Sequence, residues 1–207
     1  MLIVKVKICG VTNYDDAKVA ADLGADIIGF NFYPKSPRYI PPEKAAKIIS
    51  RLPAYVDVAG VFVNSSFNEI RDIMDSCLLS WIQLHGDEDQ QFCRLFQTLN
   101  VKIIKAVRVK SKADIETAET FNTDAILLDA FDPKKYGGTG LSFTWNIVGH
   151  IATRVFLAGG INPDNAVKAI QLGVYGIDLC SGIESDPGKK DHKKLVKLFE
   201  NIGHLRA

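Results

Sequence analysis

A cysteine and an aspartate stand where two apolar segments end, and both can move protons. Cys9 follows residues 3–8 and precedes Gly10, while Asp129 closes the apolar run 125–128. A free cysteine is most often a small buried packing residue, and a carboxyl at a strand end can simply cap backbone amides. The ends of parallel strands are also where catalytic groups gather. We therefore interpret the two side chains as a candidate base and acid.

Two glycine-bearing turns could bind a phosphate group. One carries Gly159 and Gly160, and the other carries Ser181 and Gly182. Backbone N–H groups in such turns donate to phosphate oxygens without help from a lysine. One glycine pair alone would pass as a tight turn, but paired turns after the last two strands are typical of phosphate sites in barrels.

Three charged residues could complete the site. Arg38 lies in the polar segment 31–41, and its guanidinium can hold a planar carboxylate through two parallel hydrogen bonds. Asp178, in the last expected strand, either pairs with Lys7 or contacts a ligand. Strand alternation places Lys7 one pleat below Cys9 on the same face, where its charge is expected to lower the pKa of the thiol. A purely structural ion pair is the other interpretation of Lys7.

The segments that must position these residues alternate between short β-branched runs and amphipathic stretches. We expect strands at residues 3–8, 26–30, 57–62, 81–84, 102–107, 124–129, 154–158 and 175–179, and helices at 14–23, 42–52, 66–74, 89–97, 112–119, 143–150, 163–172 and 189–201. Units of this kind, about 25 residues each, predict an α/β fold: a single (β/α)8 TIM-barrel domain over residues 1–207. A doubly wound open sheet is disfavoured, because residues 9–13 lack the glycine spacing of a dinucleotide-binding turn.

Composition restricts the class of partner. Lys and Arg number 25 against 24 Asp and Glu, so neither a nucleic-acid surface nor a charged tail is expected, and a small molecule is the better prediction. The hydrophobic content of 47% suits a large core, yet no stretch approaches the roughly 20 apolar residues of a membrane span. We expect a cytoplasmic protein. The four cysteines are widely spaced and only His85 closes an expected strand, which predicts reduced thiols and no metal site.

Seven segments, in order along the chain, resemble the phosphoribosylanthranilate isomerase family. They are residues 7–12, 34–39, 60–64, 83–88, 137–140, 157–160 and 181–184. The chain departs from the family's pattern at Cys180, where serine is expected, and at Thr144, where aspartate is expected.

The resemblance implies an Amadori rearrangement of N-(5-phosphoribosyl)anthranilate to 1-(2-carboxyphenylamino)-1-deoxyribulose 5-phosphate, without a cofactor. Asp129 would act as the general acid and Cys9 as the general base. Arg38 would hold the anthranilate carboxylate and Asp178 the anthranilate nitrogen. The phosphate would lie on Gly159, Gly160, Ser181 and Gly182. Whether the protein is a monomer or a homodimer is left open.

Two other functions fit parts of this pattern. A dual-specificity isomerase would also act on the similar aminoaldose of histidine biosynthesis, but that enzyme class resembles a site built on two aspartates, and Cys9 argues against it. A catalytically inactive phosphosugar-binding barrel would need the phosphate turns alone, since a fold does not dictate its function. The presence of both Cys9 and Asp129 argues against such a protein.

Overall fold

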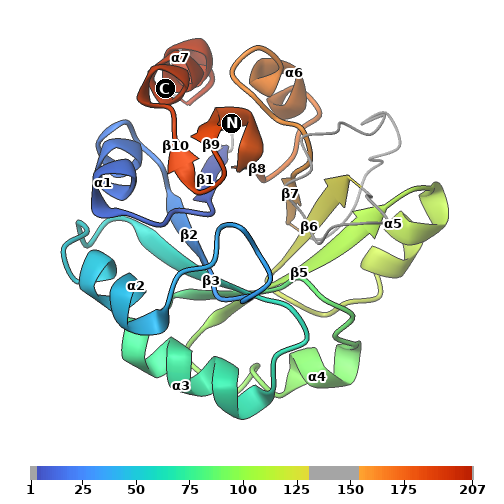
Figure 1. Ribbon diagram of the computed structural model, residues 1–207. Coiled ribbons are helices and arrows are strands. Elements are labelled where there is room, and N and C mark those ends of the chain that lie inside the picture. Colours follow the sequence, from blue (N-terminus) through green and yellow to red (C-terminus); the bar gives the residue numbers. More distant parts are fainter. Residues whose placement is uncertain (1–3, 131–153, 207) are drawn as a thin grey trace.

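The computed structural model describes residues 4–130 and 154–206, and its strands close into a barrel. Strands β1 to β8 pair in chain order and parallel, with β8 returning to β1, which confirms the predicted TIM barrel. Figure 1 shows the helices arranged around the outside of these strands. The helix expected at residues 143–150, the glycine stretch 137–140 and Thr144 lie outside the described residues.

The strands and helices of the barrel alternate along the chain. The strands are β1 (Lys5–Cys9), β2 (Ile27–Asn31), β3 (Asp57–Phe62), β4 (Trp81–Leu84), β5 (Lys102–Val109), β6 (Ala125–Ala130), β7 (Val155–Leu157) and β8 (Gly176–Leu179). The helices are α1 (Tyr14–Asp22), α2 (Pro42–Ile49), α3 (Phe67–Cys77), α4 (Gln90–Arg94), α5 (Lys112–Ala118), α6 (Ala166–Ile170) and α7 (His192–Ile202). Among the residues described here, no helix is long and apolar enough to cross a bilayer.

Alternation along each strand divides the apolar residues between two cores. Val6 and Ile8 of β1 are fully buried in the large cluster that joins the barrel to its helices. A smaller cluster fills the barrel interior, where Trp81 and Phe156 meet edge to face with ring centroids 6.3 Å apart. The inward positions of β1 instead carry Lys7 and Cys9, so this strand brings polar groups to the mouth of the barrel.

The largest departure from the sequence-based prediction follows β8. The helix expected from residue 189 begins at His192, because Asp191 caps it by accepting hydrogen bonds from the N–H groups of Lys193 and Lys194. A 3-10 turn, η2 (Ser181–Ile183), and a hairpin of β9 (Glu184–Asp186) and β10 (Lys189–Lys190) come before it. The hairpin turns at Gly188, whose φ of 83° is strained for other residues.

The helix expected at residues 163–172 is also shorter than predicted. The Asn162 side chain accepts from the N–H of Asp164 in a separate turn, and α6 starts only at Ala166. Similarly, α4 ends at Arg94 instead of residue 97. Gly24 and Gly173 do end their helices with positive φ, as predicted.

Candidate active site

One pocket at the carboxyl ends of the strands is lined by the residues predicted to act as acid, as base or as contacts of the substrate, while Lys7 is buried and does not line it. Cys9 comes from β1, Asp129 from β6 and Asp178 from β8, while Arg38 comes from the loop after β2. The turns after β7 and β8 contribute Gly159, Gly160, Ser181 and Gly182. The strand ends thus bring together side chains that are up to 173 residues apart in the chain, counted from Cys9 to Gly182.

Cys9 stands directly above a buried ion pair. Lys7 lies opposite Asp178 in the register of β1 and β8, and its Nζ is 2.9 Å from Asp178 Oδ1. The Lys7 side chain is wholly buried, as strand alternation predicted. On the other side of β1, a Cβ at Gly29 would lie 3.0 Å from Cys9 Sγ and 3.2 Å from Lys7 Nζ. Glycine at this position of β2 therefore leaves the room that the thiol and the ammonium occupy.

The pKa of Cys9 differs from the sequence-based expectation. Burial raises the pKa of the thiol, and this effect exceeds the lowering by the Lys7 charge. Asp178 adds to the rise, because a carboxylate beside the site repels the thiolate. Burial lowers the pKa of Lys7, but the attraction of Asp178 and Cys9 outweighs burial and raises this pKa above its usual value. Lys7 is therefore charged, and the free thiol of Cys9 is protonated at neutral pH.

A chain of polar side chains leads from β4 to Asp129. Asp129 Oδ2 lies 3.3 Å from His85 Nε2, and His85 Nδ1 lies 2.7 Å from Gln83 Nε2. With the amide in this assigned orientation Nδ1 is the acceptor, so the ring proton sits on Nε2 and points at Asp129. His85 thereby occupies Oδ2, and Oδ1 of this carboxyl has no hydrogen bond to the described residues.

The two glycine-bearing turns are packed against each other. Gly159 and Gly160 line the pocket and have φ of 87° and 68°, a conformation that favours glycine. A Cβ on Gly182 would lie only 2.0 Å from the carbonyl oxygen of Ile161. Glycine is therefore required at 182 for η2 to pack against the turn after β7, and residues of both turns line the pocket.

Arg38 is buried and already paired. Its Nε and Nη2 donate to Glu184 at 2.9 Å and 2.6 Å, and only 8% of the residue is exposed. Burial lowers the pKa of the guanidinium, but the hydrogen bonds that it donates to Glu184 and the attraction of nearby anionic groups together raise it, so Arg38 stays charged. The sequence predicted that Arg38 binds a substrate carboxylate, and in the structure its guanidinium is paired with the carboxylate of Glu184.

Four residues of the site escaped the sequence-based reasoning. Gln83, His85 and Glu184 lie in segments that match the family pattern, but no role had been given to them. Lys190 was assigned to a helix, and it is in fact buried beneath the pocket. Among residues 4–130 and 154–206, no cluster of three or more histidines, cysteines or carboxylates could hold a metal ion.

A closed barrel of eight parallel strands, with Cys9, Asp129 and two glycine turns at its mouth, is typical of (β/α)8-barrel enzymes that act on phosphosugars. The chain belongs to the N-(5′-phosphoribosyl)anthranilate isomerase family, whose sequence model matches residues 6–201.

Relatives support the assignment over the whole chain. The N-(5′-phosphoribosyl)anthranilate isomerase of Geotalea uraniireducens is 44% identical over 204 residues, which cover 97% of this chain and 99% of the relative. The phosphoribosylanthranilate isomerase of Thermotoga maritima superposes with a TM-score of 0.90 at 39% identity, covering 98% of this chain and all of the other. A third structure, at 38% identity and a TM-score of 0.82 with 98% and 100% coverage, holds reduced 1-(o-carboxyphenylamino)-1-deoxyribulose 5-phosphate.

Proposed function

We propose that this chain isomerises N-(5′-phosphoribosyl)anthranilate to 1-(2-carboxyphenylamino)-1-deoxyribulose 5-phosphate, with Asp129 as the acid and Cys9 as the base. The observation that carries the assignment of roles is the single pocket that both groups line together with Arg38 and the two glycine turns. Family membership supplies the reaction, and the geometry supports how this chain's own residues perform it.

The order of strands suits a substrate with three separate polar groups. The turns after β7 and β8 lie between β6, which carries Asp129, and β1, which carries Cys9. A phosphate on Gly159, Gly160, Ser181 and Gly182 would therefore place the attached sugar between acid and base. Arg38, from the loop after β2, lines the same pocket, where it would receive the anthranilate carboxylate.

The reaction needs two proton transfers. Protonated Asp129 gives its proton to the furanose ring oxygen, the C1–O bond breaks, and the nitrogen lone pair forms a C=N bond at C1. The Cys9 thiolate then removes the C2 proton, whose electron pair forms a C1=C2 bond and neutralises the iminium nitrogen. The resulting enolamine takes a proton at C1 and loses the proton of its C2 hydroxyl, which gives the C2 ketone.

A direct assay tests the activity. Freshly prepared N-(5′-phosphoribosyl)anthranilate should lose its fluorescence when the protein is added, at a rate proportional to protein concentration. Binding without turnover would point to an inactive phosphosugar-binding barrel, and equal turnover of the histidine-pathway aminoaldose would point to dual specificity. The proposed base must be a cysteine outside any disulfide, which fits our proposal that the protein works in the reducing cytoplasm.

Replacing Arg38 by methionine should weaken binding of the reduced product analogue by about 1.5–3 kcal/mol, the range for a hydrogen bond to a charged group. An analogue without the aromatic carboxylate should bind the variant and the wild type equally. Titration calorimetry with both analogues measures this difference. If both lose the same affinity, Arg38 does not recognise the carboxylate.

Chelation should leave turnover unchanged. The described residues offer no group of ligands for a metal, and the proposed proton transfers need only side chains of the protein. Initial rates before and after overnight dialysis against a chelator provide the measurement. A loss of activity that added zinc or manganese restores would contradict the proposed chemistry.

A further inference from the structure

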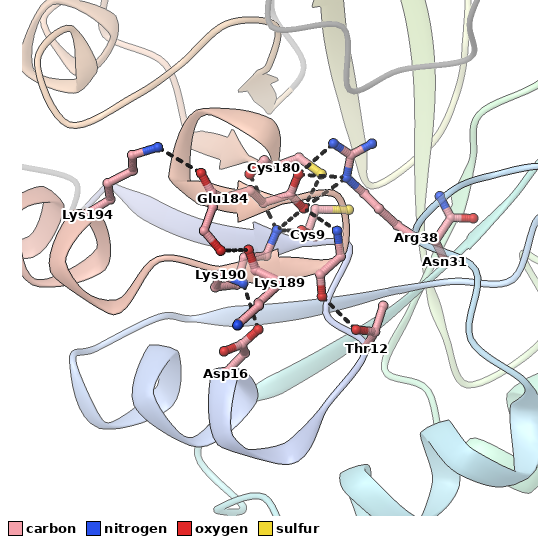
Figure 2. A network of polar contacts seen from close by, with 12 residues as sticks. Cys9, Thr12, Asp16, Asn31, Arg38, Cys180, Glu184, Lys189, Lys190 and Lys194 are labelled. Atoms are coloured by element: carbon pink, nitrogen blue, oxygen red, sulfur yellow. Dashed lines mark hydrogen bonds and ion pairs between the residues drawn. The ribbon is translucent and has the colours of Figure 1, made fainter.

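Glu184 joins the Arg38 side of the pocket to the hairpin that follows β8. It stands at the start of β9, is 7% exposed, and accepts hydrogen bonds from Arg38, from the Gly188 N–H at 3.2 Å and from Lys190 Nζ at 2.9 Å. Burial alone would raise its pKa, but the Arg38 and Lys190 contacts lower it, so the carboxylate is ionised. Figure 2 shows these contacts as a network around Glu184.

Lys190 connects this carboxylate to the strand that carries Cys9. Its side chain is wholly buried, and Nζ donates to the carbonyl oxygen of Cys9 at 2.6 Å and to that of Cys180 at 3.4 Å. Its backbone N–H donates to Asp16 at the start of α1, at 2.7 Å. The ammonium is thus held at the point where the ends of β1 and β8 meet the hairpin, and it makes contact with both strand ends (Figure 2).

The contacts of Arg38 determine which of its edges can meet a ligand. Nε and Nη2 both point at Glu184, so the side-on edge of the guanidinium is occupied. The end-on edge, formed by Nη1 and the second hydrogen of Nη2, has no hydrogen bond to the described residues. Arginine carries five N–H donors in a rigid plane, so fixing one edge also fixes the direction of the other.

We propose that Glu184 and Lys190 are positioning residues for the isomerisation. Glu184 holds Arg38 so that the end-on edge of the guanidinium receives the anthranilate carboxylate. Lys190 connects the carboxylate of Glu184 to the carbonyl of Cys9. One buried hub, formed by Glu184 and Lys190, therefore positions both Arg38, which orients the substrate, and Cys9, which takes its proton. The inference rests on the proposed roles of Arg38 and Cys9.

Charge balance supports a role beyond structure. Arg38 and Lys190 are cationic and Glu184 is anionic, so the hub and Arg38 together carry one net positive charge. The pocket beside them is proposed to bind a carboxylate and a phosphate. A hub that only stabilised the fold could be neutral. The surplus charge attracts an anionic substrate, while the ion pairs prevent the arginine from moving to meet it.

Glu184→Gln tests the first half of the proposal, because the amide keeps the shape and one acceptor and the variant should fold. We expect the reduced product analogue to bind about tenfold more weakly, while an analogue without the aromatic carboxylate binds within about twofold of wild type. Calorimetry gives both constants. Equal affinities of the folded variant and the wild type for the carboxylate-bearing analogue would overturn the positioning role of Glu184.

A double-mutant cycle separates this inference from the proposed function. If Glu184 acts through Arg38, adding Glu184→Gln to Arg38→Met should change the affinity by less than about twofold. Full additivity would show that Glu184 acts on the ligand by another route and would overturn the inference. If Arg38→Met alone has no effect, the assignment of Arg38 fails instead.

Lys190→Met tests the connection to Cys9, with Lys189→Met as the matched control. Lys189 is the neighbouring residue of β10, and it is exposed. The Lys190 variant should lose about tenfold in kcat, and its Cys9 should be alkylated more slowly at a fixed pH, because the strand end and the nearby charge both change. Lys189→Met should leave both unchanged. If Lys190→Met does not fold, Lys190→Arg replaces it, because arginine keeps the charge but changes the length of the side chain. A wild-type kcat in whichever of these variants folds would overturn the role of Lys190.

Discussion

Cys9→Ala and Asp129→Asn should each lower kcat by at least about a hundredfold, since one positioned acid or base usually contributes 10²–10⁴-fold. Each variant removes one of the two groups that exchange protons with substrate, while the phosphate turns and Arg38 are untouched. Affinity for the reduced product analogue should therefore change far less than kcat. Steady-state kinetics and calorimetry on the same preparations compare the two effects.

The structure explains why both groups must be present in the right form. Asp129 is 4% exposed and receives its only hydrogen bond among the described residues from His85, so a carboxyl with one free oxygen faces the pocket. The asparagine variant keeps the contact with His85 but cannot give up a proton as an acid does. The alanine variant opens space at Cys9 but leaves Lys7 and Asp178 paired.

Cys180 provides a control for the thiol, because it lines the same pocket. Burial raises the pKa of Cys180 to about 12, so it cannot serve as a base at neutral pH. Cys180→Ser should therefore keep most of the wild-type kcat. Near-normal turnover of folded Cys9→Ala would remove Cys9 from its proposed role, and the same result for Asp129→Asn would remove Asp129.

The barrel and the residues of its mouth could be predicted because both depend on local pattern. Apolar runs such as 125–128 mark buried parallel strands, and polar residues that end these runs must meet at one mouth once the barrel closes. Cys9, Asp129 and Asp178 were found in this way. The phosphate turns were found from glycines at the ends of the last strands.

The hub of Glu184 and Lys190 could not be found by the same reasoning. Its hairpin strands contain three and two residues, too few for any period, and the charged run around residue 190 also suits an amphipathic helix. The pairing of Arg38 with Glu184 joins residues 146 positions apart, and sequence spacing contains no information on such a contact.

The thiol pKa was missed for a different reason. Alternation correctly placed the Lys7 charge below Cys9, but the net effect depends on how deeply the thiol is buried and on which side Asp178 approaches. Both depend on the tertiary structure, and the local sequence pattern does not contain them. Because Asp178 offsets much of the field of Lys7, desolvation decides the direction of the shift.

Lys7→Met should shift the ascending limb of kcat/KM to higher pH by about one unit, the scale of one nearby charge in a partly screened site. That limb reports the general base, which must be deprotonated to act, and the pKa of Cys9 is already raised above its usual 9.0. Removing the one neighbour on β1 that lowers it raises it further. Alkylation of Cys9 at pH 7 should slow in parallel, since the thiolate is the reactive form.

The same substitution should also destabilise the protein by about 3–5 kcal/mol, because Asp178 is left buried without its partner. The pKa of Lys7 in the folded protein is raised above its usual 10.5, so the ion pair contributes fully below that pH and is lost only as pH rises through the higher folded value. Between pH 6 and 9 the stability loss is therefore constant, and it cannot imitate a shift in a titration curve. Urea unfolding at both ends of this range checks the constancy.

Two further variants isolate the charge of Lys7. Lys5→Met removes a lysine from the same strand, one that is 41% exposed in its side chain and paired with Asp26, and it should leave the Cys9 titration unchanged. Lys7→Met combined with Asp178→Asn removes both members of the pair, so it should recover stability. Its alkaline shift should be smaller than that of Lys7→Met, because removing the Asp178 charge also removes an effect that raises the pKa of Cys9. A wild-type Cys9 titration in folded Lys7→Met would mean that the lysine is only a structural partner of Asp178, and that the backbone amides near Gly10 favour the thiolate instead.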